Sequence, residues 1–367
     1  MSDLMALFRP EIAALPPYRA GVDAGEIGLD LARLDSNEAP WPPFPEAIEA
    51  IQRAARELHR YPEISCRTFI AALADCHGVA PERIVVGSGS GSLIRALGLV
   101  LLRPGDEVVI AAPAYPPYRV TATLMGANVR EVPVADGAPA LDAMRAAVTA
   151  RTRMVFVANP HNPTGGIARR TELERYLDQV PRHVVTVLDE AYHEYVADPD
   201  YPDGRRCLDT GKPLAVLRTM SKAYGLAGLR VGYAFLTAEL REALERAREN
   251  FPLSSLAQAA AVASLPRQDL VRERARAIVA ERIAMAVRCD ALGIRSAPSE
   301  ANFLFLDVRR EARVVCAALR RQGVLVRSGA VHGVPTAIRV SLGWPEDNAR
   351  FLAALPGALA EVPEGVD

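Results

Sequence analysis

The chain has 367 residues, a formal net charge of −1 and 24% charged residues, so it lacks the basic excess that binds nucleic acid. Hydrophobic residues make up 50%, which is typical of a globular protein and excludes overall disorder. No apolar run approaches the roughly 20 residues of a membrane helix, and we expect no secretory signal, because the first residues lack a basic segment followed by an apolar core. The five cysteines include no CxxC pair, so we expect reduced thiols, no metal site and a cytoplasmic protein.

The predicted elements begin with a proline-rich stretch. Residues 1–44 predict an extended arm, and a helix that opens with a proline is expected over about residues 45–60. From residue 84 onwards, apolar strands alternate with helices, which indicates an α/β fold with a mostly parallel sheet covered on both faces. The strands of this sheet are expected at residues 84–86, 107–111, 154–158, 184–188, 214–217 and 231–235.

A second, smaller α/β unit is expected after about residue 237. It starts with a long helix at 269–292 and continues with strands near 303–306, 324–327 and 338–342. We therefore predict a large domain at 45–245 and a small C-terminal domain at 246–367, with the arm (1–44) packing against the small domain.

The loops that follow the strands carry the candidate functional residues, because ligands bind beyond the carboxyl ends of strands in such sheets. The loop at 87–92 (GSGSGS) opens a helix, where free N–H groups can bind phosphate, although many turns have this composition. The loop at 159–166 contains two Asn-Pro steps. It either forms a rigid turn or presents the Asn162 amide to a ligand.

An acid and a lysine follow the next two strands. Asp189 ends a buried strand and could cap a helix or meet a cation. Lys222 is one of only two lysines in the chain, and alone it would be taken for a surface residue. A phosphate cradle, an amide, a carboxylate and a lysine on one sheet edge together suit pyridoxal 5′-phosphate (PLP). Lysine forms a Schiff base with its aldehyde, and a carboxylate pairs with its protonated pyridine nitrogen.

Three motifs resemble those of class I/II, fold-type I PLP-dependent aminotransferases. They are the lysine motif at 221–230 (SKAYGLAGLR) and the motifs at 162–165 (NPTG) and 189–192 (DEAY). Within that group the chain is most similar to histidinol-phosphate aminotransferases, and the similarity covers about residues 15–345. The segments that carry this second resemblance are 34–40 (LDSNEAP), 60–62 (RYP), 255–260 (SLAQAA) and 338–343 (IRVSLG).

The resemblance implies PLP as cofactor and a role for each matching residue. Lys222 would bind PLP and carry the proton between the donor Cα and the cofactor, while Asp189 would pair with the pyridine nitrogen. Asn162 and Tyr192 would hydrogen-bond the phenolic oxygen, and Tyr115 would stack on the ring. The residues implied for the cofactor phosphate are Ser90, Gly91, Ser92, Thr219, Ser221 and Arg230, joined by Tyr61, which would reach the phosphate of a second subunit.

The same resemblance implies a substrate pocket lined by Tyr18, Asn37, Arg327 and Arg339. Simpler interpretations remain open, because Arg339 could form a structural ion pair, Arg327 could be a surface residue and Tyr18 could cap the arm. Two departures from the family pattern lie near this pocket. Ala39 replaces an asparagine, and residues 41–43 (WPP) replace a turn that contains glycine.

The expected protein is therefore a homodimeric aminotransferase with a shared active site, acting on an amino donor and a 2-oxo acid. Histidinol phosphate and 2-oxoglutarate, giving imidazole acetol phosphate and glutamate in histidine biosynthesis, are the first choice. An aminotransferase for aromatic amino acids or a specialised metabolite is the main alternative. A PLP-dependent decarboxylase of a phosphorylated amino acid and a non-enzymatic regulator are further ones, and the near-neutral charge disfavours the regulator.

Overall fold

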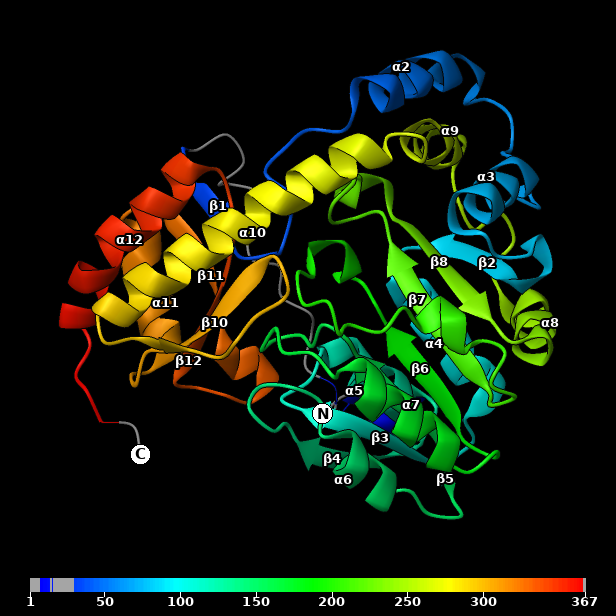
Figure 1. Cartoon of the computed structure of the whole chain (residues 1–367), viewed down its shortest axis with the longest axis horizontal. Helices are drawn as coiled ribbons and strands as arrows, with labels where there is room; N and C mark the ends of the chain where they lie inside the picture. Colours follow the sequence, from blue (N-terminus) through cyan, green and yellow to red (C-terminus); the bar gives the residue numbers. More distant parts are fainter. Residues whose placement is uncertain (1–6, 14, 16–29, 366–367) are drawn as a thin grey trace.

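The computed structural model describes residues 7–13, 15 and 30–365, which form two β-sheets flanked by helices (Figure 1). The larger sheet has seven strands. In spatial order they are β2 (Ile84–Ser88), β8 (Val231–Leu236), β7 (Leu214–Thr219), β6 (Val185–Asp189), β5 (Thr152–Ala158), β3 (Glu107–Ala112) and β4 (Asn128–Pro133). All pairs are parallel except those of β8, which runs antiparallel to both neighbours.

Both faces of this sheet are buried, as the continuous apolar strands predicted. Along β5, Val155 and Val157 belong to one hydrophobic cluster, whereas Met154 and Phe156 belong to another on the opposite face. This alternation follows from the two-residue period of a strand. One face is covered by α4 (Ser90–Leu101), α5 (Pro116–Leu124) and α8 (Ala238–Ala247), and the other by α3 (Arg67–His77), α6 (Leu141–Ala146), α7 (Arg170–Gln179) and α9 (Ser255–Ser264).

The smaller sheet has five strands in the order β1 (Ala32–Leu34), β11 (Val324–Ser328), β12 (Ala337–Ser341), β10 (Phe303–Asp307) and β9 (Arg295–Ser296). Its helices are α10 (Gln268–Ala291), α11 (Ala312–Arg321) and α12 (Pro345–Ala360). Figure 1 shows α10 extending from the end near α9 to the smaller sheet, where it lies beside α12. The α10 helix therefore spans the two halves of the molecule.

Several predicted elements need correction. The helix that begins at residue 45 is α2 (Pro45–Ala54), which ends early and continues as a 3-10 turn, Ala55–Glu57. The arm is not wholly irregular, because it contains the short helix α1 (Pro10–Ala13) and the strand β1, which pairs with β11 in parallel. Strand β4 was missed because it is an edge strand whose residues are mostly exposed, so it lacks an apolar run. The division at residues 44 and 245 stays a prediction.

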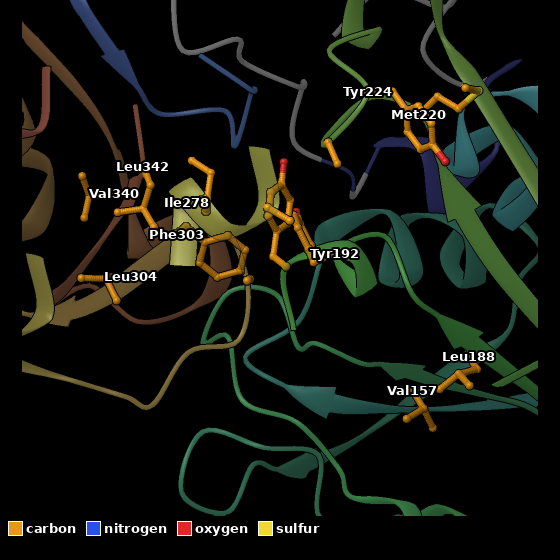
Figure 2. Packing of buried hydrophobic residues seen from close by; sticks show 14 of the residues in the cluster. Val157, Leu188, Tyr192, Met220, Tyr224, Ile278, Phe303, Leu304, Val340 and Leu342 are labelled. Carbon is orange, nitrogen blue, oxygen red and sulfur yellow. The ribbon is translucent and has the colours of Figure 1, made fainter. Parts of the chain in front are cut away.

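Aromatic packing joins the two halves. Tyr192, which follows β6, contacts Phe303 of β10 edge to face, with 5.1 Å between ring centroids. In Figure 2, the rings of Tyr192 and Phe303 lie between two groups of apolar side chains. Leu304 and Val340 belong to the smaller sheet, and Val157 and Leu188 belong to the larger one. Both rings belong to one continuous buried cluster. Residues at the carboxyl ends of the larger sheet are thereby placed directly against the smaller sheet.

Candidate active site

A cavity of about 430 Å³ lies where the carboxyl ends of β5, β6 and β7 face the smaller sheet. Its walls come from three parts of the chain: the segment 35–38, the strand-end loops of the larger sheet, and the strands β11 and β12. This size and this position are typical of a small-molecule site in an α/β fold. Thirteen of the predicted site residues line it: Asn37, Ser90, Gly91, Tyr115, Asn162, Asp189, Tyr192, Thr219, Ser221, Lys222, Arg230, Arg327 and Arg339.

Lys222 projects into this cavity from the loop after β7. Its Nζ donates a hydrogen bond to the carbonyl of Ser36 at 3.1 Å and lies 5.7 Å from the centre of the Tyr192 ring. Burial, followed by the positive charge of Arg339, lowers the pKa of Lys222 to about 7. A substantial fraction of the amine is therefore unprotonated at neutral pH, which is the form that attacks a carbonyl.

Asp189 ends β6 and is 5% exposed. Its carboxylate accepts hydrogen bonds from the Tyr118 hydroxyl at 2.8 Å and from the Ala191 N–H at 3.2 Å. Burial raises the pKa of Asp189 to about 6, against the opposing effect of these two hydrogen bonds. A cation brought beside the carboxylate would lower that pKa again, so the position suits a protonated ring nitrogen.

Tyr192 receives two amide hydrogen bonds. Asn37 Nδ2 lies 3.0 Å and Asn162 Nδ2 lies 3.2 Å from its hydroxyl oxygen. The Asn162 amide orientation is fixed because its Oδ1 accepts from Arg339 Nη1 at 2.9 Å, and a guanidinium can only donate. Since the Tyr192 oxygen accepts twice, its own hydrogen is available to a ligand in the cavity.

The segment before α2 is tied to the smaller sheet through Asn37. Its N–H and Oδ1 both bond Ser341 Oγ, at 2.7 and 2.9 Å, and its carbonyl accepts from Asn302 Nδ2 at 3.1 Å. Asn37 adopts a φ of 53°, in the left-handed region that asparagine tolerates better than most residues. Arg339 adds a bond from Nη2 to the Asp35 carbonyl at 2.9 Å, while its Nε is buried without a hydrogen-bond partner.

A cradle for an anion forms where α4 begins. Ser90 and Gly91 occupy the first turn of this 12-residue helix, whose leading N–H groups have no partner within the helix. Gly89, at a φ of 74°, lies against the Arg230 guanidinium; a Cβ there would sit 2.5 Å from Nη2. Thr219 Oγ1 lies 2.9 Å from Ser221 Oγ, which in turn lies 3.5 Å from Arg230 Nη1. N–H groups, hydroxyls and one guanidinium thus converge, as phosphate binding requires.

A buried ion pair lies beneath the cavity and connects the ends of β6 and β7. Arg218 donates to Glu190 Oε2 at 2.7 and 2.9 Å, and both side chains are at most 3% exposed. Glu190 follows Asp189 and Arg218 precedes Thr219, so the pair fixes the strand ends that carry the site. Removing one partner of such a pair typically destabilises a protein by about 3–5 kcal/mol.

Two predicted residues are absent from the cavity wall. Ser92 is absent from the cavity wall, because its hydroxyl turns back to the Gly89 carbonyl at 3.0 Å. Tyr61 is 84% exposed and stacks on Phe251, with 4.6 Å between ring centroids, so it does not serve the cavity of its own chain. Tyr18 falls outside the described residues.

Tyr118 and His332 also line the cavity, and neither was predicted. Tyr118 lies one helical turn after Tyr115, and that spacing could have suggested a shared role at the start of α5. His332 ends the 3-10 turn η8 (Gly329–His332) and lines the cavity. The sequence feature that could have indicated His332 is its position between two strands, each of which carries an arginine of the cavity wall.

Among the described residues, no group of three or more His, Cys, Asp or Glu side chains is placed to hold a metal ion.

Residues 39–43, where the sequence departs from the family pattern, belong to the segment before α2 and lie where this segment meets α10 and α12. Trp41 meets Trp344 edge to face at 5.6 Å, and the Arg274 guanidinium lies 5.6 Å from the Trp41 ring and 4.2 Å from Phe44. Arg274 also donates to the Pro42 carbonyl at 2.8 Å. These residues therefore hold the segment that carries Asn37, and they are not themselves part of the cavity wall.

This set of groups fits PLP. The cradle at the start of α4 suits its phosphate, the Asp189 carboxylate its ring nitrogen, and the Lys222 amine its aldehyde. With a seven-stranded, mostly parallel sheet and a second, smaller sheet, the molecule has the architecture of a PLP-dependent enzyme of fold type I.

Comparison with known proteins gives the family. The model of aminotransferases of class I and II matches residues 30–355, and the chain belongs to this family. It is a PLP-dependent aminotransferase, so the prediction from the motifs is confirmed. Family membership gives the decarboxylase and regulator interpretations no support.

Individual relatives extend this result. The chain is 38% identical over 358 residues to a histidinol-phosphate aminotransferase of Moorella thermoacetica, covering 96% of this chain and 93% of the relative. It is 40% identical over 353 residues to an aromatic amino acid aminotransferase of Streptomyces coelicolor, covering 96% and 97%. A crystal structure of histidinol-phosphate aminotransferase from Sinorhizobium meliloti in complex with pyridoxal-5′-phosphate superposes with a TM-score of 0.89, at 29% identity and 97% and 98% coverage. The predicted resemblance and fold are confirmed.

Proposed function

We propose that this enzyme transfers the amino group of histidinol phosphate to 2-oxoglutarate, a step of histidine biosynthesis. The observation that carries the proposal is the pairing of Arg327 with Arg339. They face each other in register on the antiparallel strands β11 and β12, and both line the cavity. Two guanidinium groups at one place suit a phosphate dianion, and equally a carboxylate of glutamate in the second half of the reaction. Relatives with the matching name add to this support.

We assign the reaction steps to residues as follows. Bound PLP supplies the reactive carbonyl and an electron sink. Lys222 Nζ takes the proton from the donor Cα and returns it on the cofactor side, aided by its lowered pKa. Asp189 would keep the ring nitrogen of bound PLP protonated, and Tyr192 and Asn162 would hydrogen-bond its phenolic oxygen. Arg327 and Arg339 orient the donor so that its Cα–H bond faces the lysine.

The test of this function mixes the PLP-loaded protein with single donors, without an oxo acid, and follows the cofactor absorbance. Conversion to pyridoxamine phosphate should be fast with histidinol phosphate and with glutamate, and slow with phenylalanine and tyrosine. Fast conversion by the aromatic donors and none by histidinol phosphate would refute the proposal. The second candidate, an aromatic amino acid aminotransferase, would then hold; relatives of that name are 40% and 42% identical to the chain.

Arg339→Lys is expected to raise the KM for histidinol phosphate about ten- to a hundredfold, because lysine keeps the charge but loses the paired donors. The effect on kcat should be smaller, since the cofactor contacts of Lys222 and Asp189 remain. Steady-state kinetics with varied donor measure both constants. Arg295→Lys, on the exposed edge of β9, is the matched control and should leave both unchanged. An unchanged KM in Arg339→Lys would remove the residue from substrate binding.

We also propose that the enzyme is a cytoplasmic homodimer in which Tyr61 binds the cofactor phosphate of the other subunit. Support comes from Tyr61 itself, which is 84% exposed and held by Phe251 outside its own cavity. The five free cysteines are in keeping with a reducing compartment. Among the described residues, no helix is long and apolar enough to cross a membrane.

Tyr61→Phe is expected to weaken PLP binding about tenfold, the loss of one hydrogen bond to a charged group. Equilibrium titration of the apoenzyme with PLP measures this. A hybrid dimer of one Lys222→Ala chain and one Tyr61→Phe chain then separates the two arrangements. If Tyr61 acts across the dimer, the only site with a lysine receives an intact tyrosine and keeps wild-type affinity. If Tyr61 acts within its own chain, that site stays weakened.

A further inference from the structure

The side chain of His332 has a fixed tautomer. Its Nδ1 lies 3.0 Å from the carbonyl oxygen of Ala114, in the loop just before Tyr115. A carbonyl oxygen can only accept, so Nδ1 must carry the hydrogen. In a neutral imidazole the other nitrogen, Nε2, then presents a lone pair.

That second nitrogen is unsatisfied. His332 Nε2 is buried and has no hydrogen-bond partner in the structure. Burial, and then the positive charge of Arg339, lower the pKa of His332 to about 4, so the ring is neutral at physiological pH. A buried acceptor without a donor costs free energy, and a ligand that supplies the donor recovers it.

The surroundings of this lone pair show what kind of ligand can use it. His332 lies in the cavity wall with Arg327 and Arg339, whose guanidinium groups donate hydrogen bonds and accept none. An anionic end of the substrate would occupy those groups. His332 adds a hydrogen-bond acceptor to this wall, which a phosphate dianion or a carboxylate cannot satisfy but an N–H or O–H group can.

We propose that His332 determines specificity for the side chain of the amino donor, its Nε2 accepting a hydrogen bond from an N–H or O–H group carried by a ring. This proposal deepens the proposed function. The imidazole of histidinol phosphate and the phenol of tyrosine carry such a group, whereas phenylalanine and glutamate carry none in their side chains. His332 would therefore favour donors with a polar ring over donors with an apolar ring of the same size.

Binding to the pyridoxamine phosphate form tests this, because that form binds an amino donor without converting it. Calorimetry gives Kd for histidinol phosphate, tyrosine, phenylalanine and glutamate with wild type, His332→Phe and His332→Gln. In His332→Phe we expect Kd to rise about ten- to a hundredfold for whichever of histidinol phosphate and tyrosine binds the wild type. Phenylalanine and glutamate should stay within about threefold. His332→Gln, which keeps an acceptor near the Nε2 position, should recover part of the loss.

The outcomes separate the two proposals. Wild type that does not bind histidinol phosphate refutes the proposed function, and the tyrosine and phenylalanine pair still tests His332. An equal loss for all four ligands in His332→Phe, or no loss for either polar ring, overturns the assignment of His332. Thermal melting and cofactor absorbance check that each variant is folded. Should His332→Phe not fold, wild-type affinities for tyrosine and O-methyltyrosine decide, since equal values overturn the assignment.

Discussion

Replacing Lys222 by alanine is expected to lower transamination by more than about 10⁴-fold, since both covalent attachment and proton transfer are lost. The amine of Lys222 lies in the cavity beside the Ser36 carbonyl, and its pKa of about 7 suits both tasks. Single-turnover conversion of the bound cofactor by the preferred donor measures the loss. A Lys222→Ala protein that transaminates at the wild-type rate would overturn the assignment of the active site.

The sequence provides a matched control, because it contains just one other lysine. Lys212 donates hydrogen bonds to the backbone carbonyls of Asp178 and Val180 and is no part of the cavity wall. Lys212→Ala should transaminate normally. Borohydride reduction of the PLP-loaded enzyme should then fix the cofactor to the peptide that contains Lys222 in wild type and in Lys212→Ala, and to no peptide in Lys222→Ala.

Asp189→Asn should lower kcat on the order of 10³-fold, the effect of removing one preorganised charge at a reacting centre. Asparagine has nearly the same shape, but it lacks the negative charge that keeps the ring nitrogen protonated. PLP should still attach through Lys222, so the absorbance of the bound cofactor separates loss of chemistry from loss of binding. Asp178→Asn, exposed on α7, is the control. A loss of less than about tenfold, or 1.4 kcal/mol, would contradict the role of Asp189.

The sequence predicted the residues that follow the parallel strands, because strand ends can be located from apolar runs. Asp189, Asn162 and Lys222 follow such runs within about five residues, and the structure brings all three into one cavity. The antiparallel direction of β8 was not predicted, although the length of its connection to β7 indicates it. Residues 220–230 connect it to β7 without a crossover helix, and parallel neighbours need a longer connection.

Contacts between distant parts of the chain could not be predicted. The bonds between Asn37 and Ser341 join residues 304 positions apart, and no local pattern records them. The hydrogen bond from Tyr118 to Asp189 is of the same kind, because it depends on how α5 packs against the sheet. His332 was not predicted because its proposed role depends on its tautomer. That tautomer is fixed by the Ala114 carbonyl, which lies in another loop.

The contact between Trp41 and Trp344 has an optical consequence. These are the only two tryptophans in the chain, and they touch each other where the N-terminal segment meets the start of α12. Intrinsic fluorescence excited at the indole band therefore arises from one place in the molecule. A shift in the wavelength of this emission on addition of an amino donor reports on that junction, so an unlabelled protein already carries its own spectroscopic probe of how the segment bearing Asn37 responds to ligands.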